Sequence, residues 1–258
     1  MDTARVPPRP ADPPRIPPRR GRRVALVAVA AAAVLGVVLA VTLNGDGDDG
    51  PSGHALRAFP GFRAAHADTV VLDGVSGTVR VTADPGAHAV TGDFHRPDGH
   101  PAALRGSTSG DDVLTLTCPD GHGHPQPCAG DLTLVLPAHT GLRLRQTSGE
   151  ATLDGLGGDL ALDAASIRLT TRRLHPAHAD VTVVSGSADL GFTAAPADLG
   201  VHATSASVAV RLPRTEGGYA VTTDETSADV RIAVPRNPAA GHRVSLAVTS
   251  GSLSVRNA

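Results

Sequence analysis

The sequence predicts an all-β domain, built as a solenoid-like stack of short β-strand repeats and preceded by one N-terminal transmembrane helix. Three observations support this: a long uncharged segment near the N-terminus, a Ser-Gly motif that recurs about every 20 residues, and alternation of apolar and polar residues after each copy. The alternative architecture for the repeats is a β-sandwich, in which turns also punctuate short alternating strands.

Composition and charge limit the classes of function. The chain has 258 residues and is 41% hydrophobic, but it holds only four Phe, one Tyr and no Trp. This content argues against disorder throughout and against an aromatic-rich enzyme core. Residues 1–23 carry seven Arg against Asp2 and Asp12, a charge of +5, so the remaining residues carry −2 − 5 = −7. An acidic body repels phosphate backbones, so no nucleic-acid partner is expected.

The predicted transmembrane helix comprises residues 24–43, which contain no charged side chain. Twenty residues at about 1.5 Å each match the roughly 30 Å hydrocarbon core of a membrane. A cleaved signal peptide is the alternative, although its apolar stretch is usually only about 7–15 residues. Basic residues that flank a first helix stay in the cytoplasm. We therefore expect a single-pass cell-membrane protein with a cytoplasmic Pro/Arg-rich tail (1–23), a juxtamembrane linker (44–63) and an extracellular β-repeat domain (64–258).

Seven copies of a short motif recur in the exported domain. Six of the seven pairs begin with Ser, and the pairs are Ser76-Gly77, Ser148-Gly149, Ala164-Ala165, Ser185-Gly186, Ser205-Ala206, Ser227-Ala228 and Ser250-Gly251. Positions +3 and +5 from the first residue are aliphatic in every copy, as in Val79/Val81 and Leu253/Val255. The residue between them is polar in six copies. This alternation predicts a strand with one buried face.

A second alternating pair precedes several copies at −4 and −2, as in Val181/Val183 and Leu246/Val248. These positions are out of phase with +3 and +5 by one residue. A phase slip would turn side chains to the wrong face of a continuous strand, so the Ser-Gly pair is predicted to be a corner or bulge. From Ser148 onward the copies are 16, 21, 20, 22 and 23 residues apart, which is typical of stacked coils that bury a shared core.

The repeated units, most clearly VSGTVRV, TSGEATL, VSGSADL and TSGSLSV, resemble the bacterial putative-adhesin family of β-strand repeats, also called the toastrack domain. The resemblance covers residues 64–258. It implies an all-β solenoid-like domain in the cell envelope, found in surface proteins and in membrane proteins of envelope-stress systems, with no catalytic residues to transfer. The segment 95–128, rich in Pro, Gly and His, departs from the pattern and matches no repeat unit.

The two cysteines, Cys118 and Cys128, flank the segment PDGHGHPQP between two alternating stretches. We interpret these stretches as a hairpin, which would bring the two residues within disulfide range. An oxidising exterior and an even cysteine count favour a bridge. The alternative is a zinc site formed by Cys118, His122, His124 and Cys128, although this spacing matches no common zinc finger.

The remaining motifs have simpler explanations. Asp46–Gly50 lacks the acidic residues that a calcium loop needs at its fifth and twelfth positions, so it is interpreted as linker. Gly157-Gly158-Asp159 and Leu212–Glu216, the second close to a sortase signal, are predicted to be turns. The histidines His54, His66, His139, His175 and His202 are expected at the surface. Arg80, Arg168 and Arg231 are expected beside Asp189 on one face, as a soluble sheet face requires.

We therefore expect a membrane-anchored, non-enzymatic envelope protein with no cofactor or metal, held in the membrane through residues 24–43. Its β-repeat ectodomain would bind or scaffold an envelope protein or a surface polymer in the manner of an adhesin. The alternative is an envelope-stress sensing or signalling component, and a third, weaker candidate is a β-helical polysaccharide-active enzyme. The sequence names neither the ligand nor the oligomeric state.

Overall fold

The computed structural model describes residues 56–58, 62–64, 67–97, 104–109, 113–119, 125–126 and 128–258, with some terminal strands given as backbone only. The predicted membrane helix at residues 24–43 lies outside these ranges. Within them, no helix is long or apolar enough to cross a membrane. The described secondary structure is all β, in fourteen strands: β1 (Leu56–Ala58), β2 (Phe62–Ala64), β3 (Thr69–Asp84), β4 (Val90–His95), β5 (Leu104–Ser109), β6 (Val113–Pro119), β7 (Pro125–Gln126), β8 (Cys128–Pro137), β9 (Gly141–Asp154), β10 (Leu160–Arg172), β11 (His178–Gly191), β12 (Asp198–Leu212), β13 (Ala220–Ala233) and β14 (Arg243–Asn257).

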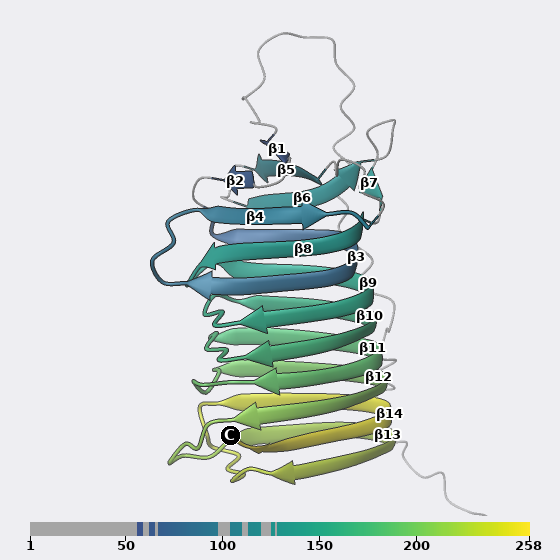
Figure 1. The fold of residues 1–258 in the computed structure, drawn as a ribbon. Coiled ribbons are helices and arrows are strands. Elements are labelled where there is room, and N and C mark those ends of the chain that lie inside the picture. Colours follow the sequence, from purple (N-terminus) through teal and green to yellow (C-terminus); the bar gives the residue numbers. More distant parts are fainter. Residues whose placement is uncertain are drawn as a thin grey trace, which may run out of the picture. The chain divides into compact units, whose positions relative to one another are not determined.

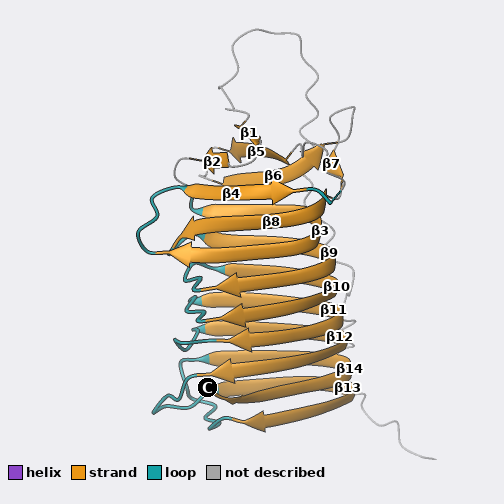
Figure 2. Ribbon diagram, viewed as in Figure 1, coloured by secondary structure: helices purple, strands orange, loops and turns teal. Residues whose placement is uncertain are grey.

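The long strands stack in parallel, one per coil. Each strand from β9 to β14 bends near its middle, so that its first arm lies in one layer and its second arm in the other (Figure 1). Neighbouring coils are in register at the repeated motif, as shown by the pairs Ser148↔Ser166, Ser166↔Ser185 and Ser185↔Ser205. Apolar side chains from both arms fill the space between the layers, and loops join successive coils on the side opposite the bend (Figure 2).

The bend coincides with the predicted corner, and serine hydroxyls link its coils. Ser185 Oγ donates to the carbonyl of Ala165 at 2.9 Å and lies 2.9 Å from Ser166 Oγ. Ser250 Oγ makes the same contact with the carbonyl of Thr204, at 2.8 Å. The repeated serine therefore satisfies a backbone acceptor of the next coil at the point where the strand changes direction.

From β9 to β13 in the order of the sheet, the residue after the serine alternates in backbone conformation from coil to coil. Gly149, Gly186 and Gly251 have φ of +107°, whereas Ile167, Ala206 and Ala228 do not adopt positive φ. At Gly251 a Cβ atom would lie 2.2 Å from the carbonyl oxygen of Ala206, so only glycine fits there.

One repeat copy was placed wrongly from the sequence. We predicted a corner at Ala164-Ala165, but Ser166 is the residue that pairs with Ser148 and Ser185. The corner of β10 is therefore Ser166-Ile167. Ile167 and Leu169, predicted to be core residues, are buried, and so is Thr171 at the +5 position counted from Ser166. With this shift every aligned copy begins with Ser, because the aligned serines are Ser76, Ser148, Ser166, Ser185, Ser205, Ser250 and Ser227.

The order of the coils departs from the order of the chain. The sheet runs β9-β10-β11-β12-β14-β13, so the C-terminal strand β14 inserts between β12 and β13. Figure 1 shows this as the yellow strand lying above the yellow-green one, and β13 is the last strand of the stack. Successive repeats therefore do not stack in sequence order at this end.

The opposite end is built differently. β6 pairs with the first arm of β3 and β8 with its second arm, both in parallel, so β6 and β8 together form one coil. Antiparallel strands continue both layers, since β5 pairs with β6 and β1, while β4 pairs with β8 and β2. The hairpin predicted around the cysteines is therefore wrong, because the strands on either side are two arms of a coil. The segment 95–128 contributes β5 and β6 to this end.

Candidate binding surface

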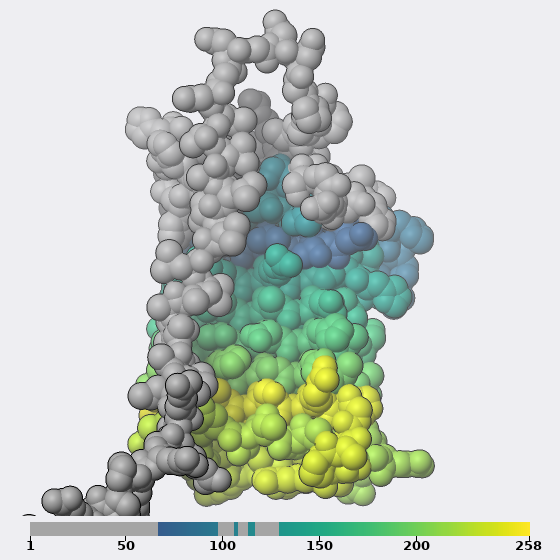
Figure 3. All heavy atoms as spheres, turned by 180° about the vertical axis from the view of Figure 1, so that it is seen from behind, coloured from purple at the N-terminus to yellow at the C-terminus, as the bar shows by residue number. Residues whose placement is uncertain are grey.

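The outward side chains of the second arms form one face of the stack. We use the name second-arm face for the surface formed by the outward residues of β10, β11, β12 and β14. These residues are Arg168, Thr170, Ser187, Asp189, Ser207, Ala209, Ser252 and Ser254. These residues lie in two rows across the coils, because neighbouring strands are in register. Most of these side chains are small and polar, so the surface is recessed between the larger charged side chains. Figure 3 shows the other side of the molecule, where the coils appear as successive colour bands.

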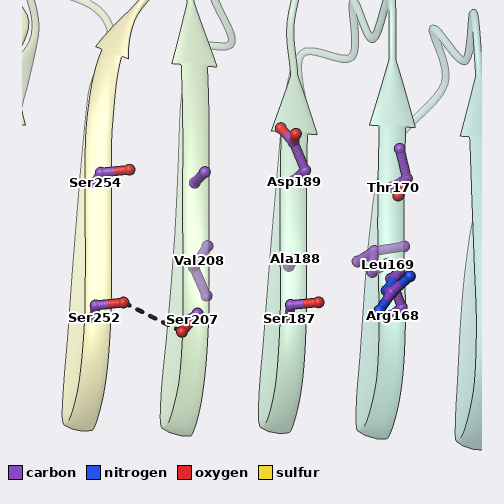
Figure 4. Close-up of a pocket in the computed structure, with 11 residues that line it drawn as sticks. Arg168, Leu169, Thr170, Ser187, Ala188, Asp189, Ser207, Val208, Ser252 and Ser254 are labelled. Atoms are coloured by element: carbon purple, nitrogen blue, oxygen red, sulfur yellow. Dashed lines mark hydrogen bonds between the residues drawn. The ribbon is translucent and has the colours of Figure 1, made fainter.

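A shallow depression of about 430 Å³ lies on the second-arm face. Figure 4 shows Arg168 and Thr170 on one of its sides and Ser252 and Ser254 on the other, with Ser187 and Asp189 between them. Ser252 Oγ donates to Ser207 Oγ at 3.3 Å, which is the contact drawn there. The depression thus offers hydroxyl groups and one guanidinium to a ligand.

Asp189 is the carboxylate of this surface, and only one of its two oxygens accepts a hydrogen bond. Its Oδ2 accepts a hydrogen bond from Arg211 at 2.6 Å, while its Oδ1 is buried and has no hydrogen-bond partner. Arg211 belongs to the neighbouring coil β12. The pair holds the carboxylate across two coils, as an ordinary inter-strand ion pair does.

Two further ion pairs lock the coils on the loop side. Arg173 donates to both oxygens of Asp154 at 2.8 Å, and this hydrogen bond lowers the pKa of the Asp154 carboxyl. Arg243, at the start of β14, binds both oxygens of Asp198, at the start of β12, and lowers the pKa of that carboxyl in the same way. These carboxylates are ionised at neutral pH and tied to arginines, so they are unsuited to act as general acids.

The outward face of the first arms carries looser pairs. His202 Nε2 lies 4.0 Å from Asp180, and His178 Nδ1 lies 3.6 Å from Asp198. Arg145 lies 3.9 Å from Asp163 on the neighbouring coil. All these side chains are at least one-third exposed, so this face is a solvated polar surface.

The cysteine site is placed by its backbone only. Cys118 lies in β6 and pairs with Gln126 of β7, and Cys128 begins β8 beside Val75 of β3. Cys118 therefore lies near the end of β6 and Cys128 at the start of β8, the two arms of one coil. His122 and His124, the other ligands of the zinc alternative, lie outside the described residues, so the disulfide stays a prediction. Among the described side chains, no group of three or more His, Cys, Asp or Glu could hold a metal ion.

The other predicted surface residues are placed as follows. His139, His175 and His202 are exposed, as predicted. Arg168 and Asp189 border the same depression, whereas Arg80 and Arg231 lie on coils outside it. Gly157–Asp159 and the residues after Leu212 lie between strands, as predicted for turns. His54, His66 and Asp46–Gly50 lie outside the described residues.

Tyr219 is a structural residue that the sequence analysis missed. It is fully buried next to β13, and its hydroxyl donates to the carbonyl of Pro213 at 2.7 Å. Burial raises the pKa of its phenol. The sequence signal for this structural role was that Tyr219 is the single tyrosine in a chain almost without aromatic residues.

Comparison with known proteins gives structural neighbours only. A scan of family models finds no match, and a search of curated proteins finds no relative. Among solved structures, the chain is similar to a putative cell adhesion protein from Clostridium sporogenes, with a TM-score of 0.43 and 8% identity over 78% of this chain and 100% of that one. It is also similar to a putative adhesin from Bacteroides fragilis, with a TM-score of 0.38 and 12% identity over 77% and 96% of the two chains. A third neighbour, a putative lipid binding protein from Parabacteroides distasonis, has a TM-score of 0.29 and 8% identity over 79% and 98%. At these identities the neighbours transfer no function to this chain.

Proposed function

We propose that the chain is a single-pass envelope protein whose β-repeat domain binds an extended partner outside the cell and performs no catalysis. The observation that carries this proposal is the second-arm face, where an open depression bordered by hydroxyl groups crosses four coils in register. Anchoring through residues 24–43 comes from the sequence, as does the orientation with residues 1–23 inside.

The depression suits an extended ligand better than a compact one. It is open to solvent and spans coils at the normal strand spacing of roughly 4.8 Å, so a partner can contact equivalent hydroxyls on successive coils. Ser187, Ser207 and Ser252 form one such row. A hydroxyl-rich surface polymer or an extended polypeptide can exchange hydrogen bonds with this row. Arg168 adds a guanidinium beside the row, whereas the Asp189 carboxylate is already bound by Arg211.

Two features favour binding over catalysis. Enzyme sites need carboxyls or other groups whose pKa values are tuned toward the working pH, commonly by burial. The carboxyls with displaced pKa values here, Asp154 and Asp198, are shifted away from that range by arginines on the loop side. Neither residue borders the depression.

The binding surface is tested with the full chain displayed on cells and with purified envelope polysaccharide as the probe. We expect Ser207→Arg, which fills the centre of the row, to reduce retention of the polymer. Thr182→Arg, on the outward side of a first arm, is the matched control and should leave retention unchanged. Equal retention by wild type and Ser207→Arg would contradict this assignment of the surface.

The membrane topology is tested separately. Protease added to intact cells or protoplasts should degrade residues 44–258 and spare residues 1–23. Release of the domain into the medium with a new N-terminus near residue 41 would instead show a cleaved signal peptide.

An envelope sensor is the second candidate, favoured by the basic, proline-rich tail of residues 1–23. It requires a cytoplasmic partner that binds this tail. Deletion of the tail would then abolish the response to envelope damage while leaving surface binding intact.

A further inference from the structure

The last strand of the stack presents a free edge. β13 pairs with β14 along one side and terminates the strand order of the described sheet. An unpaired edge exposes backbone N–H and C=O groups that can pair with another strand. β13 has 14 residues, so this edge is long.

The apolar side chains of this coil are only partly covered. Val230 and Ile232 are half-buried, whereas their register partners in β14, Leu253 and Val255, are each 1% exposed. The difference arises because β14 has a coil on both sides and β13 has one. A further coil against the free edge would complete their burial.

We propose that a second copy of this chain docks on the free edge, with the two β13 strands antiparallel about a two-fold axis. A two-fold axis that runs through both corners places the first arm of one β13 against the second arm of the other. Because side chains alternate, only registers that pair inward residues with inward residues preserve the core. The corners match when Ser227 of one copy is opposite Ala228 of the other.

The charges select the same register. Arg231 binds Asp229 of its own strand at 2.8 Å. With Ser227 opposite Ala228, the same guanidinium is also opposite Asp224 of the other copy, and the symmetry repeats this contact. A shift of two residues one way places Asp224 opposite Asp229, which is repulsive, and a shift the other way places Arg231 opposite Thr226. Cross-strand pairs of opposite charge are favourable and like charges are unfavourable. One register therefore satisfies the faces, the corners and the charges together.

Glu225 keeps this contact weak. It occupies an inward position, since its register partner in β14 is the buried Val248. In the docked pair it is opposite Val230 of the other copy, where its carboxylate loses water. Weak contacts become effective when many copies are held on one surface, because tethering raises the effective concentration.

The position of the edge gives the docking a consequence, which rests on the proposed membrane anchor. β1 and β2, where the chain enters the described domain, lie at the end of the stack opposite β13. Two copies joined at β13 therefore have their N-terminal entries at opposite ends of the pair. This geometry joins molecules on two facing membranes, and the inference is homotypic adhesion.

The test uses the full chain reconstituted in phosphatidylcholine vesicles, with vesicle aggregation as the readout. Wild type should aggregate vesicles. Arg231→Asp alone and Asp224→Arg alone should each weaken aggregation roughly tenfold, because each makes two like-charge pairs. Vesicles carrying Arg231→Asp mixed with vesicles carrying Asp224→Arg should aggregate again, since both pairs are then attractive. Failure of this mixture to aggregate, or dispersed wild-type vesicles, would overturn the proposal.

Control variants separate the contact from folding and from the membrane topology. Arg80→Asp changes the same charge on the interior coil β3 and should not alter aggregation. Glu225→Gln should strengthen it. Sedimentation of the full chain in detergent reports association whether or not the chain spans a membrane. Dimers in detergent, together with a protease result that contradicts the proposed topology, would refute the membrane anchor and leave the β13 contact standing. Monomers at all concentrations, together with the expected protease result, would refute the contact alone.

Discussion

β13 and β14 are neighbouring coils with the same motif, yet β14 is an interior coil and β13 is the end of the stack. At the inward positions of the first arm, β14 has Leu246 and Val248, whereas β13 has Thr223 and Glu225. The first pair is buried and the second is exposed. The terminal coil of a repeat protein needs a polar outer face for the single chain to remain soluble, because no further coil of the same chain covers it. The comparison shows that the two inward side chains of the first arm distinguish a terminal coil from an interior coil. The order of the coils in the chain does not.

The largest effect is expected from a charge in an interior coil. Val210→Asp in β12 places a carboxylate in a fully buried position and should lower the free energy of unfolding by roughly 4–5 kcal/mol. Ile232→Asp, at the equivalent position of β13, should cost only about 1–2 kcal/mol, because its side chain keeps contact with water. Urea unfolding of both variants measures the difference. Equal costs would show that β13 is covered as completely as β12.

The corner gives the next largest effect. Gly251→Ala in β14 should destabilise by roughly 2–3 kcal/mol, since the residue has φ of +107° and the added methyl would collide with the Ala206 carbonyl. Ala228→Gly in β13 is the matched change and should cost at most about 1 kcal/mol, from backbone entropy alone. Thermal unfolding of the two variants checks this. A larger loss from Ala228→Gly would show that the corners of the two coils are not distinct.

Tyr219→Phe should loosen β13 while leaving β14 in place. It removes the hydrogen bond to Pro213 and should cost about 1 kcal/mol. The raised pKa of Tyr219 means that the neutral phenol is favoured in the folded state. Its contribution is therefore complete below the unfolded pKa of about 10 and is lost as pH rises through the folded value. Hydrogen exchange should show faster exchange in β13 for the variant, and wild type but not Tyr219→Phe should lose stability specifically above pH 10.

The smallest effect is expected at the seam between β12 and β14. Asp198→Asn removes the pair with Arg243, which is exposed, so the melting temperature at pH 7 should change only slightly. The lowered pKa of Asp198 means that the pair contributes above the unfolded pKa of about 3.9 and is lost as pH falls through the folded value. Melting curves from pH 7 to pH 2 should therefore converge for wild type and variant in acid. A gap that widens in acid would contradict this origin of the shift.

The sequence by itself determined the local structure of the repeats. Alternation at +3 and +5 identified the buried residues of the second arms, and the phase slip located the corner, because both depend on residues adjacent in the chain. Only the copy in β10 was misplaced, by two residues. There Ala164-Ala165 offered the small side chains expected of a corner, whereas the true corner at Ser166-Ile167 has a large second residue.

The tertiary structure decided which coils are neighbours. Stacking energy comes from contact between coils and does not depend on their order in the chain, so β14 can insert between β12 and β13 because residues 213–219 connect β12 to β13 past the inserted coil. The same freedom lets β6 and β8 share a coil across an insertion at its corner. Two signals of the insertion were present, the polar Thr223 and Glu225 and the alternation of glycine with larger residues at the corners. Neither signal could be interpreted from the sequence alone, because each residue must be compared with its register partner in a neighbouring coil. Those partners are distant in sequence. The second-arm face and the free edge of β13 exist only through that arrangement.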